Sequence, residues 1–391
     1  MTFRLRCSAC QRDYDPASLA WRCGCGGLLD LAPFEAQFPL SAIQTRPATL
    51  WRYREALPFA PDESGWQSVT MGEGMTPLVP LSPQQPQVLL KVDYQMPTLS
   101  FKDRGAVVLI AKAKALGVSR VIADSSGNAG TAIAAYAARA GMACDVYVPA
   151  SASAKKLKQI AAHGAAVHAI PGSREDTAAA AIAAVEQEGI FYASHVYNPF
   201  FFQGTKTYAF ELWEQLGGSV PSVLVLPVGN GTLVLGAYYG FQDLLRAGLI
   251  QQLPRILAVQ AEGCAPLAQA FQQGKDVAAP VVNTGTEAEG IAIAAPARSR
   301  QILAAVRETR GIIITVSDEA ITSARATLAQ RGFYVEPTAA APYAGFLAYH
   351  EAVLNNGLPA DQPPLFSADL QSKSPTAQVV IPLCGAGLKA G

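Results

Sequence analysis

Hydrophobic residues recur along this chain in short apolar runs that alternate with longer alanine-rich stretches. Near-continuous apolar runs separated by segments of helix length are typical of a parallel sheet with helices on both faces. The expected strands are 88–94, 121–124, 144–149, 167–170, 223–226, 256–260, 312–316 and 379–383. The expected helices are 105–116, 128–140, 154–163, 175–187 and 233–246. The pattern therefore predicts the α/β class.

The number of strand–helix units predicts two open, twisted, mainly parallel sheets covered by helices. A chain of 391 residues is long enough to form two cores. In such folds ligands bind at the carboxyl ends of the strands, so we expect the site there, between the sheets. The predicted domains are a cysteine module (1–35), a connector with the first part of a large domain (36–97), a smaller α/β domain (98–206) and the remainder of the large domain (207–391).

Composition narrows the class of protein. Half of the residues are hydrophobic and 15% are charged, as expected for a globular chain. The 30 Lys and Arg residues equal the 30 Asp and Glu residues, which argues against a nucleic-acid partner. The apolar runs are too short to span a bilayer, and the N-terminus has no apolar signal core. We therefore expect a cytoplasmic enzyme with no membrane partner.

Four of the seven cysteines form two close pairs near the N-terminus. Cys7-x-x-Cys10 and Cys23-x-Cys25 lie about a dozen residues apart, a spacing typical of a tetrahedral zinc site. The glycines that follow allow the backbone to bend around the thiolates. The pattern predicts structural zinc. The alternatives are a metal-free module or four unrelated thiols.

A lysine opens the first long helix. Ser100-Phe101-Lys102-Asp103-Arg104-Gly105 follows a strand and a Pro-containing turn. Burial at this position disfavours the ammonium form and makes the neutral amine available as a nucleophile, which an imine-forming lysine requires. The alternative is a surface lysine paired with Asp103. We expect Asp103 and Arg104 to form a charge pair that fixes the start of the helix.

Two loops between a strand and a helix carry further candidate chemistry. Ser125-Ser126-Gly127-Asn128-Ala129-Gly130 offers hydroxyls and helix N-terminal amides, which suit a carboxylate. The alternative is ordinary N-capping by Ser126 or Asn128. Val228-Gly229-Asn230-Gly231-Thr232 has glycines that let backbone N–H groups converge on a phosphate. It matches neither the Walker motif nor the dinucleotide fingerprint.

Together these motifs resemble the tryptophan-synthase-β-like, fold-type-II pyridoxal-phosphate enzymes, and 98–105 is most similar to the threonine synthase version of the lysine motif. The resemblance covers about 73–389, and many threonine synthase homologues also carry the cysteine module. It implies pyridoxal phosphate as cofactor, bound as an imine to Lys102, which also removes the substrate's α-proton. It further implies that Asn128 binds the pyridoxal 3′-oxygen, that Val228 to Thr232 hold the phosphate, and that Cys384 faces the pyridine nitrogen. A homodimer is the family expectation.

The expected substrate-binding residues are Ser125, Ser126, Gly127, Ala129, His195 and Phe201. Threonine synthases usually bind the phosphate of O-phosphohomoserine with an arginine and a threonine, whereas Phe201 and Ala129 stand at these positions here. A phenylalanine cannot offer the donors that a phosphate prefers. The stretch 287–292 also looks more like the corresponding loop of serine and threonine dehydratases. Lys206 either supplies a phosphate contact or pairs with Glu211.

The leading hypothesis is elimination or replacement on a small L-amino acid, with conversion of O-phosphohomoserine to threonine as the reaction that the resemblance suggests. The second is a serine or threonine dehydratase or an ammonia lyase. The third is a non-catalytic regulator that binds an amino acid, or nucleic acid through the cysteine module. We also expect Arg298 and Arg300 to cap a helix or form ion pairs at the surface.

Overall fold

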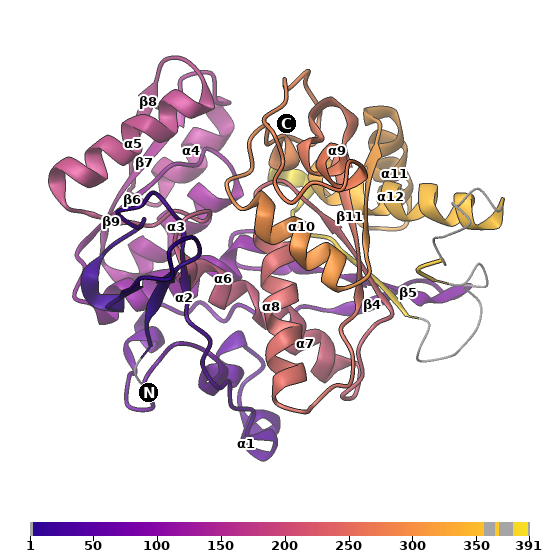
Figure 1. Cartoon of the computed structure of the whole chain (residues 1–391), viewed down its shortest axis with the longest axis horizontal. Coiled ribbons are helices and arrows are strands. Elements are labelled where there is room, and N and C mark those ends of the chain that lie inside the picture. Colours follow the sequence, from indigo (N-terminus) through magenta and orange to yellow (C-terminus); the bar gives the residue numbers. More distant parts are fainter. Residues whose placement is uncertain (1–2, 356–363, 367–377, 390–391) are drawn as a thin grey trace. The chain divides into compact units, whose positions relative to one another are not determined.

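The computed structural model describes residues 3–355, 364–366 and 378–389, and the chain divides into two compact units (Figure 1). Unit 1 contains residues 1–75 and 96–207, and unit 2 contains 76–95 and 208–391. The chain passes between the units after residues 75, 95 and 207. From the sequence we grouped 36–97 with the large domain, whereas 36–75 lie in unit 1.

Unit 1 has a small N-terminal sheet and a parallel sheet. The small sheet, of strand order β2-β1-β3, is antiparallel. The parallel sheet has the order β8-β7-β6-β9. The strands are β1 (Leu5–Cys7), β2 (Asp13–Tyr14), β3 (Leu29–Leu31), β6 (Arg120–Ala123), β7 (Ala143–Pro149), β8 (Ala166–Ile170) and β9 (Phe191–Tyr192). The helices are α1 (Leu40–Thr45), α2 (Lys102–Ala115), α3 (Asn128–Ala140), α4 (Ala154–Ala162), α5 (Arg174–Glu188) and α6 (Pro199–Thr205).

The alternation of side chains along β6 explains how helices cover both faces of the parallel sheet. Val121 and Ala123 belong to one core cluster with residues of α2, α3 and α4. Ile122, between them, belongs to a second cluster with Ala181 and Val185 of α5. Because successive side chains of a strand point to opposite faces, α5 covers the face opposite to α2 and α3.

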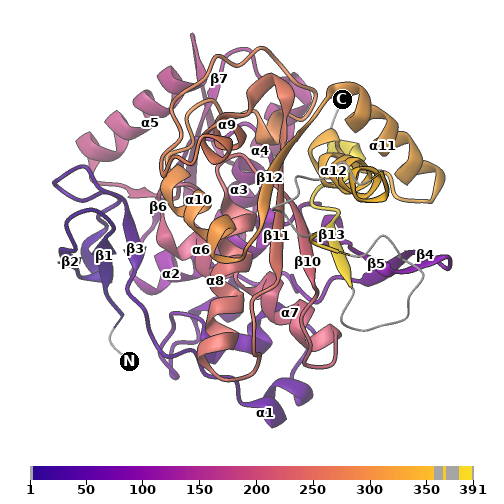
Figure 2. The same cartoon turned by 45° about the vertical axis from the view of Figure 1, so that its right-hand side comes forward.

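Unit 2 is built on a sheet of order β12-β11-β10-β13-β5-β4, parallel except for β4, which pairs antiparallel with β5 at the edge. Helix α12 contacts β10, β11, β12 and β13 (Figure 2). The strands are β4 (Leu78–Ser82), β5 (Gln85–Lys91), β10 (Val223–Pro227), β11 (Arg255–Ala261), β12 (Ile312–Val316) and β13 (Val379–Pro382). The helices are α7 (Thr207–Gln215), α8 (Thr232–Arg246), α9 (Pro266–Gln272), α10 (Ser299–Glu308), α11 (Asp318–Gln330) and α12 (Pro337–Leu354).

The structure confirms the predicted α/β class with two mainly parallel sheets. Helix α3 and strand β12 have the bounds expected from the sequence, while α2 begins at Lys102 and not at Gly105. Strand β4 was not expected, because its mixed sequence Leu-Val-Pro-Leu-Ser contains a proline, which an edge strand tolerates.

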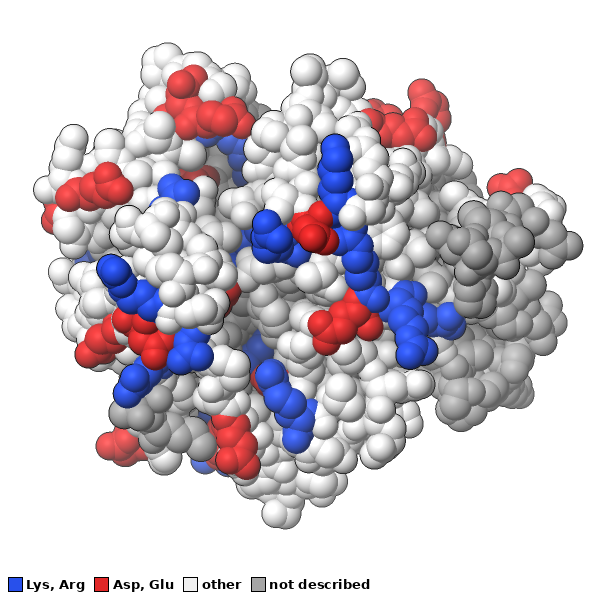
Figure 3. All heavy atoms as spheres, in the orientation of Figure 1, with Lys and Arg blue, Asp and Glu red and all other residues white. Residues whose placement is uncertain are grey.

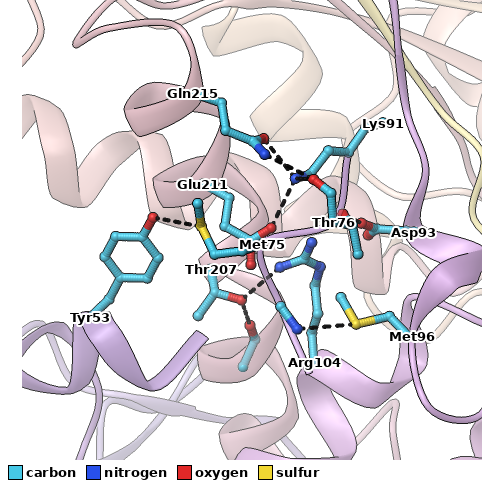
Figure 4. A network of polar contacts seen from close by, with 12 residues as sticks. Tyr53, Met75, Thr76, Lys91, Asp93, Met96, Arg104, Thr207, Glu211 and Gln215 are labelled. Atoms are coloured by element: carbon cyan, nitrogen blue, oxygen red, sulfur yellow. Dashed lines mark hydrogen bonds and ion pairs between the residues drawn. The ribbon is translucent and has the colours of Figure 1, made fainter. Parts of the chain in front are cut away.

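A buried ion pair anchors the start of unit 2 (Figure 4). Lys91 and Glu211 are both completely buried, and Lys91 Nζ lies 2.9 Å from Glu211 Oε2. Lys91 Nζ also donates to the Thr76 carbonyl (2.7 Å) and to Gln215 Oε1 (2.8 Å). Glu211 and Gln215 lie four residues apart on α7 and therefore share a face of that helix. The structure thus pairs Glu211 with Lys91. The ammonium of Lys206 lies 4.9 Å from the centroid of the Phe34 ring.

Charge on the surface is mixed. On the face drawn in Figure 3, basic and acidic side chains are interspersed among uncharged ones, as a net charge of zero suggests. None of the helices in the described parts of the chain is long and apolar enough to cross a membrane.

Candidate functional site

The turn that precedes Lys102 is fixed from within unit 1. Leu99 has φ of 62°, in the left-handed region, which costs energy for a residue with a branched side chain. The buried carboxylate of Asp103 accepts hydrogen bonds from the Thr98 amide (2.6 Å) and the Thr98 hydroxyl. Asp103 therefore holds the turn closed, and Lys102 becomes the first residue of α2.

Two aromatic rings lie near the Lys102 side chain, which is half-buried. Its ammonium lies 4.6 Å from the centroid of the Phe101 ring and 5.9 Å from that of Phe201. The hydroxyl of Ser100 is buried close by in the sequence and has no hydrogen-bond partner among the described residues. A ligand could satisfy this hydroxyl, because buried polar groups normally have a partner.

His195 lies beside the Phe201 ring, with ring centroids 6.0 Å apart in an edge-to-face arrangement. It is only 6% exposed. Burial lowers the pKa of His195 well below its usual value, and the positive charges of Lys102 and Arg174 lower it further. The imidazole is therefore neutral near pH 7.

Glycines allow α2 and α6 to approach closely. A Cβ on Gly204 would lie 1.9 Å from the Arg104 carbonyl oxygen. The Arg104 side chain is completely buried, and its Nη1 donates to the Thr207 hydroxyl (3.2 Å; Figure 4). Thr207 in turn donates to the Gly204 carbonyl (2.7 Å). These contacts fix α6, which carries Phe201, against the first turn of α2.

The loop from Ser125 to Gly130 does not serve as a side-chain cap for α3. The N-cap residue is Gly127, and no side chain makes a cap hydrogen bond there. Neither Ser126 nor Asn128 is therefore the N-cap residue of α3. A Cβ on Gly130 would lie 1.8 Å from the Ser125 carbonyl oxygen, so the loop requires a glycine at this position. The N-terminus of this 13-residue helix carries the partial positive charge that favours an anion.

The register of β6 and β9 places polar residues side by side at the carboxyl edge. Ile122 pairs with Tyr192, and the Ala193 amide donates to the Ile122 carbonyl (2.8 Å). Asp124 follows the last residue of β6, and Ser194 comes two residues after the end of β9, so both lie at the carboxyl edge of the parallel sheet. The loop from Ser125 to Gly130 and the segment that carries His195 therefore share one edge of the unit 1 sheet.

Asp124 is a polar residue of this edge that the sequence analysis counted only as part of a strand. Its Oδ1 is enclosed and forms no well-aligned hydrogen bond within the described parts. Burial raises the pKa of Asp124 to about 6, although the nearby hydroxyls of Tyr192 and Ser194 and the charge of Arg174 act in the opposite direction. An acidic residue at the end of an otherwise apolar strand was the available signal.

In unit 2, the loop from Val228 to Thr232 joins β10 to α8 and is shaped by its glycines. Gly231 has φ of 78°, and a Cβ on Gly229 would lie 2.8 Å from a side-chain carbon of Ile293 and 2.9 Å from the Cα of Ile291. Gln260 Nε2 donates to the Val228 carbonyl (3.2 Å), which fixes the end of the strand. The stretch around Ile291 that resembles the dehydratase loop therefore packs directly on this loop.

Cys384 follows β13, the strand next to β10. Val228 follows the last residue of β10, and Cys384 comes two residues after the end of β13, so both lie at the carboxyl ends of neighbouring parallel strands. The thiol side chain is 1% exposed. A Cβ on Gly385 would lie 2.1 Å from a carboxylate oxygen of Glu336, so a glycine is required after the cysteine. The structure thus brings the glycine loop and Cys384 to one edge of the unit 2 sheet.

The four N-terminal cysteines of unit 1 form a compact cluster. All four Sγ atoms lie within 4.8 Å of one another, and the Cys7–Cys25 and Cys10–Cys23 sulfurs are 3.5 Å apart. Tetrahedral zinc with Zn–S bonds of about 2.3 Å would separate its sulfurs by about 3.8 Å. A backbone hydrogen bond from Cys25 and one from the Tyr14 hydroxyl lower the pKa of Cys23 to about 6, which favours the thiolate that a metal needs.

Arg298 differs from its expected place at the surface. It is 1% exposed, and its Nη1 donates to Gln301 Oε1 (3.0 Å) at the start of α10. Arg300, in contrast, is exposed. The run of charged and small residues around both arginines gave no sign of which one is enclosed.

Comparison with known sequences identifies related proteins. A family described as pyridoxal-phosphate dependent enzyme matches residues 69–362. Threonine synthase of Methanosarcina acetivorans is 34% identical over 353 residues, covering 88% of this chain and 86% of the relative. Threonine synthase of Mycobacterium tuberculosis is 36% identical over 315 residues, covering 79% of this chain and 84% of the relative.

Solved structures resemble the chain as well. A threonine deaminase from the organism abbreviated T.th. is 25% identical with a TM-score of 0.64, covering 84% of this chain and 98% of that one. Maize serine racemase is 21% identical with a TM-score of 0.64, covering 80% of this chain and 88% of that one, and it shows the likeness of fold alone.

Proposed function

Because this chain belongs to the family of pyridoxal-phosphate-dependent enzymes, we propose that it is a lyase of the threonine synthase type, with Lys102 as its catalytic residue. The observation that carries the proposal is the position of Lys102 as the first residue of α2, with its amine beside the Phe101 and Phe201 rings. In its neutral form a lysine amine can act as nucleophile and as base.

The residues fit pyridoxal phosphate. Val228 to Thr232 would hold the phosphate, since their glycines are demanded by close packing and the N-terminus of α8 favours an anion. Cys384 would face the pyridine nitrogen, and Asn128 would bind the 3′-oxygen. When bound, the cofactor supplies an electron sink for the carbanion that forms at the substrate's α-carbon.

The chain's own residues would bind the substrate and move its proton. The amides at the N-terminus of α3, with Ser125, Ser126, Gly127 and Ala129, would receive the α-carboxylate. The Lys102 amine would then remove the α-proton. Neutral His195 and the ring of Phe201 would line the side-chain pocket and keep water away from the amine.

The leading substrate is O-phosphohomoserine, converted to threonine, and the support for it is the similarity to threonine synthases. A dehydratase or ammonia lyase acting on serine or threonine is the second candidate. It is favoured by Phe201, which is completely buried between Phe200 and Phe202 and would receive a phosphate dianion poorly. A non-catalytic regulator is the least favoured of the three.

One experiment separates these functions. Protein loaded with pyridoxal phosphate is given O-phosphohomoserine, L-serine or L-threonine, and released phosphate, threonine and 2-oxo acid are measured. Phosphate release with threonine formation supports the threonine synthase assignment. Oxo-acid release from L-serine or L-threonine alone moves the assignment to the dehydratases. No turnover of any of them, together with no cofactor absorbance, favours the regulator.

Three further features belong to the proposal. Structural zinc on Cys7, Cys10, Cys23 and Cys25 is supported by the closeness of the four sulfurs. A homodimer and a cytoplasmic location rest on the resemblance to the family. Gel filtration with light scattering would test the dimer, and metal analysis would test the zinc.

A further inference from the structure

Trp21 connects the cysteine module to the segment 192–198, which carries His195. Its ring meets Tyr192 edge-to-face, with centroids 5.5 Å apart and an interplanar angle of 86°. It meets Tyr197 in the same way, at 5.3 Å and 78°. Tyr192 and Tyr197 are themselves stacked, with centroids 6.0 Å apart. Trp21 stands two residues before Cys23, one of the four candidate metal ligands. The position of Cys23 therefore constrains the indole ring of Trp21.

Each tyrosine lies beside one of the candidate substrate-binding segments. The Tyr192 side chain is 1% exposed, and its hydroxyl is next to Asp124, the residue that precedes the carboxylate loop. Tyr197 stands between His195 and Asn198, and Asn198 Nδ2 donates back to the Tyr192 carbonyl (3.1 Å). A shift of the aromatic pair would therefore move both segments.

The residues that follow Trp21 are fixed to the turn that carries the second cysteine pair. Arg22 Nε donates to the Gly26 carbonyl (2.6 Å), and Arg22 forms an isolated antiparallel bridge with Leu28. A Cβ on Gly27 would lie 2.5 Å from Cys7 Sγ, so the turn after the second cysteine pair is packed on the sulfurs. Metal bound to the four thiolates would fix both ends of the stretch 11–22 that includes Trp21.

We propose that Trp21 is a positioning residue through which the metal-bound cysteine module holds Tyr192 and Tyr197, and with them the two substrate-binding segments. Metal in the module would then govern substrate affinity without touching the substrate. The inference rests on the proposed function and on the proposed metal. It differs from a purely structural role because it predicts an effect on KM and not on cofactor binding.

The test compares three variants of the full-length protein loaded with pyridoxal phosphate. Trp21→Ala removes both ring contacts, and Trp21→Phe keeps an aromatic ring. Trp66→Ala is the matched control, because Trp66 stacks on Trp51 at 4.7 Å in the same unit. The apparent Kd for L-serine is read from the change in cofactor absorbance, and KM and kcat are measured with whichever substrate turns over.

Trp21→Ala should raise Kd and KM about 10-fold, because it removes both edge-to-face ring contacts. The kcat should stay within about twofold. Trp21→Phe should retain most of the affinity, and Trp66→Ala should leave Kd unchanged. Wild-type affinity in Trp21→Ala would overturn the proposal, as would an equal rise in Trp66→Ala. The absorbance titration needs no turnover, so it still decides this point if the proposed reaction is not observed.

Metal removal tests the link to the cysteines. Chelation should raise the Kd for L-serine in the wild type and leave it unchanged in Trp21→Ala. The fluorescence of Trp21, obtained by subtracting the spectrum of Trp21→Phe from that of the wild type, should also change on chelation. If chelation weakened binding equally in Trp21→Ala, the coupling would not pass through Trp21, and the proposal would be wrong.

Discussion

The ring of Phe201 fills the space in which a side chain on Gly105 would lie: a Cβ built on Gly105 would be 2.3 Å from Cε1 of Phe201. Phe201 is completely buried, so its ring has no room to withdraw. The position at which related enzymes are expected to present an arginine is thus occupied by an aromatic ring that is packed on the helix of Lys102.

Gly105→Ala should therefore destabilise unit 1. Overpacking of a buried contact costs about 1–3 kcal/mol, and the displaced ring would also disturb Lys102. The expected result is a lower midpoint of thermal unfolding together with weaker cofactor binding. Gly65→Ala is the matched control, because nothing lies within 4 Å of a Cβ at that position. Equal midpoints for the two variants would contradict the account of the packing.

Lys91→Met should destabilise unit 2. It leaves the completely buried carboxylate of Glu211 without its ammonium partner, a loss that costs about 3–5 kcal/mol. Urea unfolding should show this loss, and the double variant Lys91→Met/Glu211→Gln should recover part of it. Arg4→Met, which removes an exposed pair with Asp13, is the control and should change stability by less than about 1 kcal/mol. Additive effects of the two buried substitutions would show that the pair is not coupled.

Asp124 should make folding stability depend on pH in weakly acidic solution. Its pKa in the folded chain is about 6, against about 3.9 for an unperturbed aspartate. Between these two pKa values the folded state holds a proton that the unfolded state has released. The contribution of Asp124 to the free energy of unfolding therefore falls as the pH rises through this window. Asp124→Asn should remove this trend and be more stable at neutral pH, by at most about 3 kcal/mol.

Urea midpoints at a series of pH values would measure the effect, with Asp62→Asn as a control at an exposed aspartate. The difference between wild type and Asp124→Asn should change between about pH 4 and pH 6 and level off above it. If the urea midpoints of the wild type and Asp124→Asn changed with pH in parallel, the pKa of Asp124 would not be raised by burial.

His195 should act in the opposite direction. Its pKa is well below the usual value, so on acidification the unfolded chain takes up a proton that the buried imidazole does not accept. The contribution of His195 to the free energy of unfolding is fully present above about pH 6.5 and is lost as the pH falls below that value. His195→Asn should flatten this part of the stability profile. If the stability of His195→Asn fell with decreasing pH as steeply as that of the wild type, the imidazole would be solvated.

The cysteine module should carry about one zinc ion for each chain. Metal analysis of purified protein checks this, and Cys10→Ser should lose the metal and lower the unfolding temperature. Cys264→Ser, at a buried cysteine outside the cluster, is the control and should keep the zinc. Full zinc content in Cys10→Ser would exclude the four-cysteine site.

Local patterns in the sequence were sufficient for much of the fold. The strand–turn–helix pattern before Lys102 and the glycine that ends α3 are recorded in neighbouring residues. Helix α3 forms with the expected bounds, and α2 forms but begins at Lys102 and not at Gly105. The partners of Glu211 and the burial of Arg298 depend on residues far away in the chain, and periodicity carries no such information.

The candidate site divides in the same way. The loops around Asn128 and Gly229 have local signatures, because helix N-termini and glycines shape them. The significance of Asp124 and Trp21 is not local, because it depends on Tyr192, which reaches them through the pairing of β6 with β9 and the packing of the cysteine module.

Reduction of the cofactor-loaded protein with borohydride, followed by peptide mass spectrometry, tests the central claim most directly. The account predicts that the pyridoxyl group is attached to the peptide containing Lys102, and that Lys102→Ala binds no cofactor covalently and has no turnover. Attachment to a different lysine, or turnover that survives in Lys102→Ala, would contradict it.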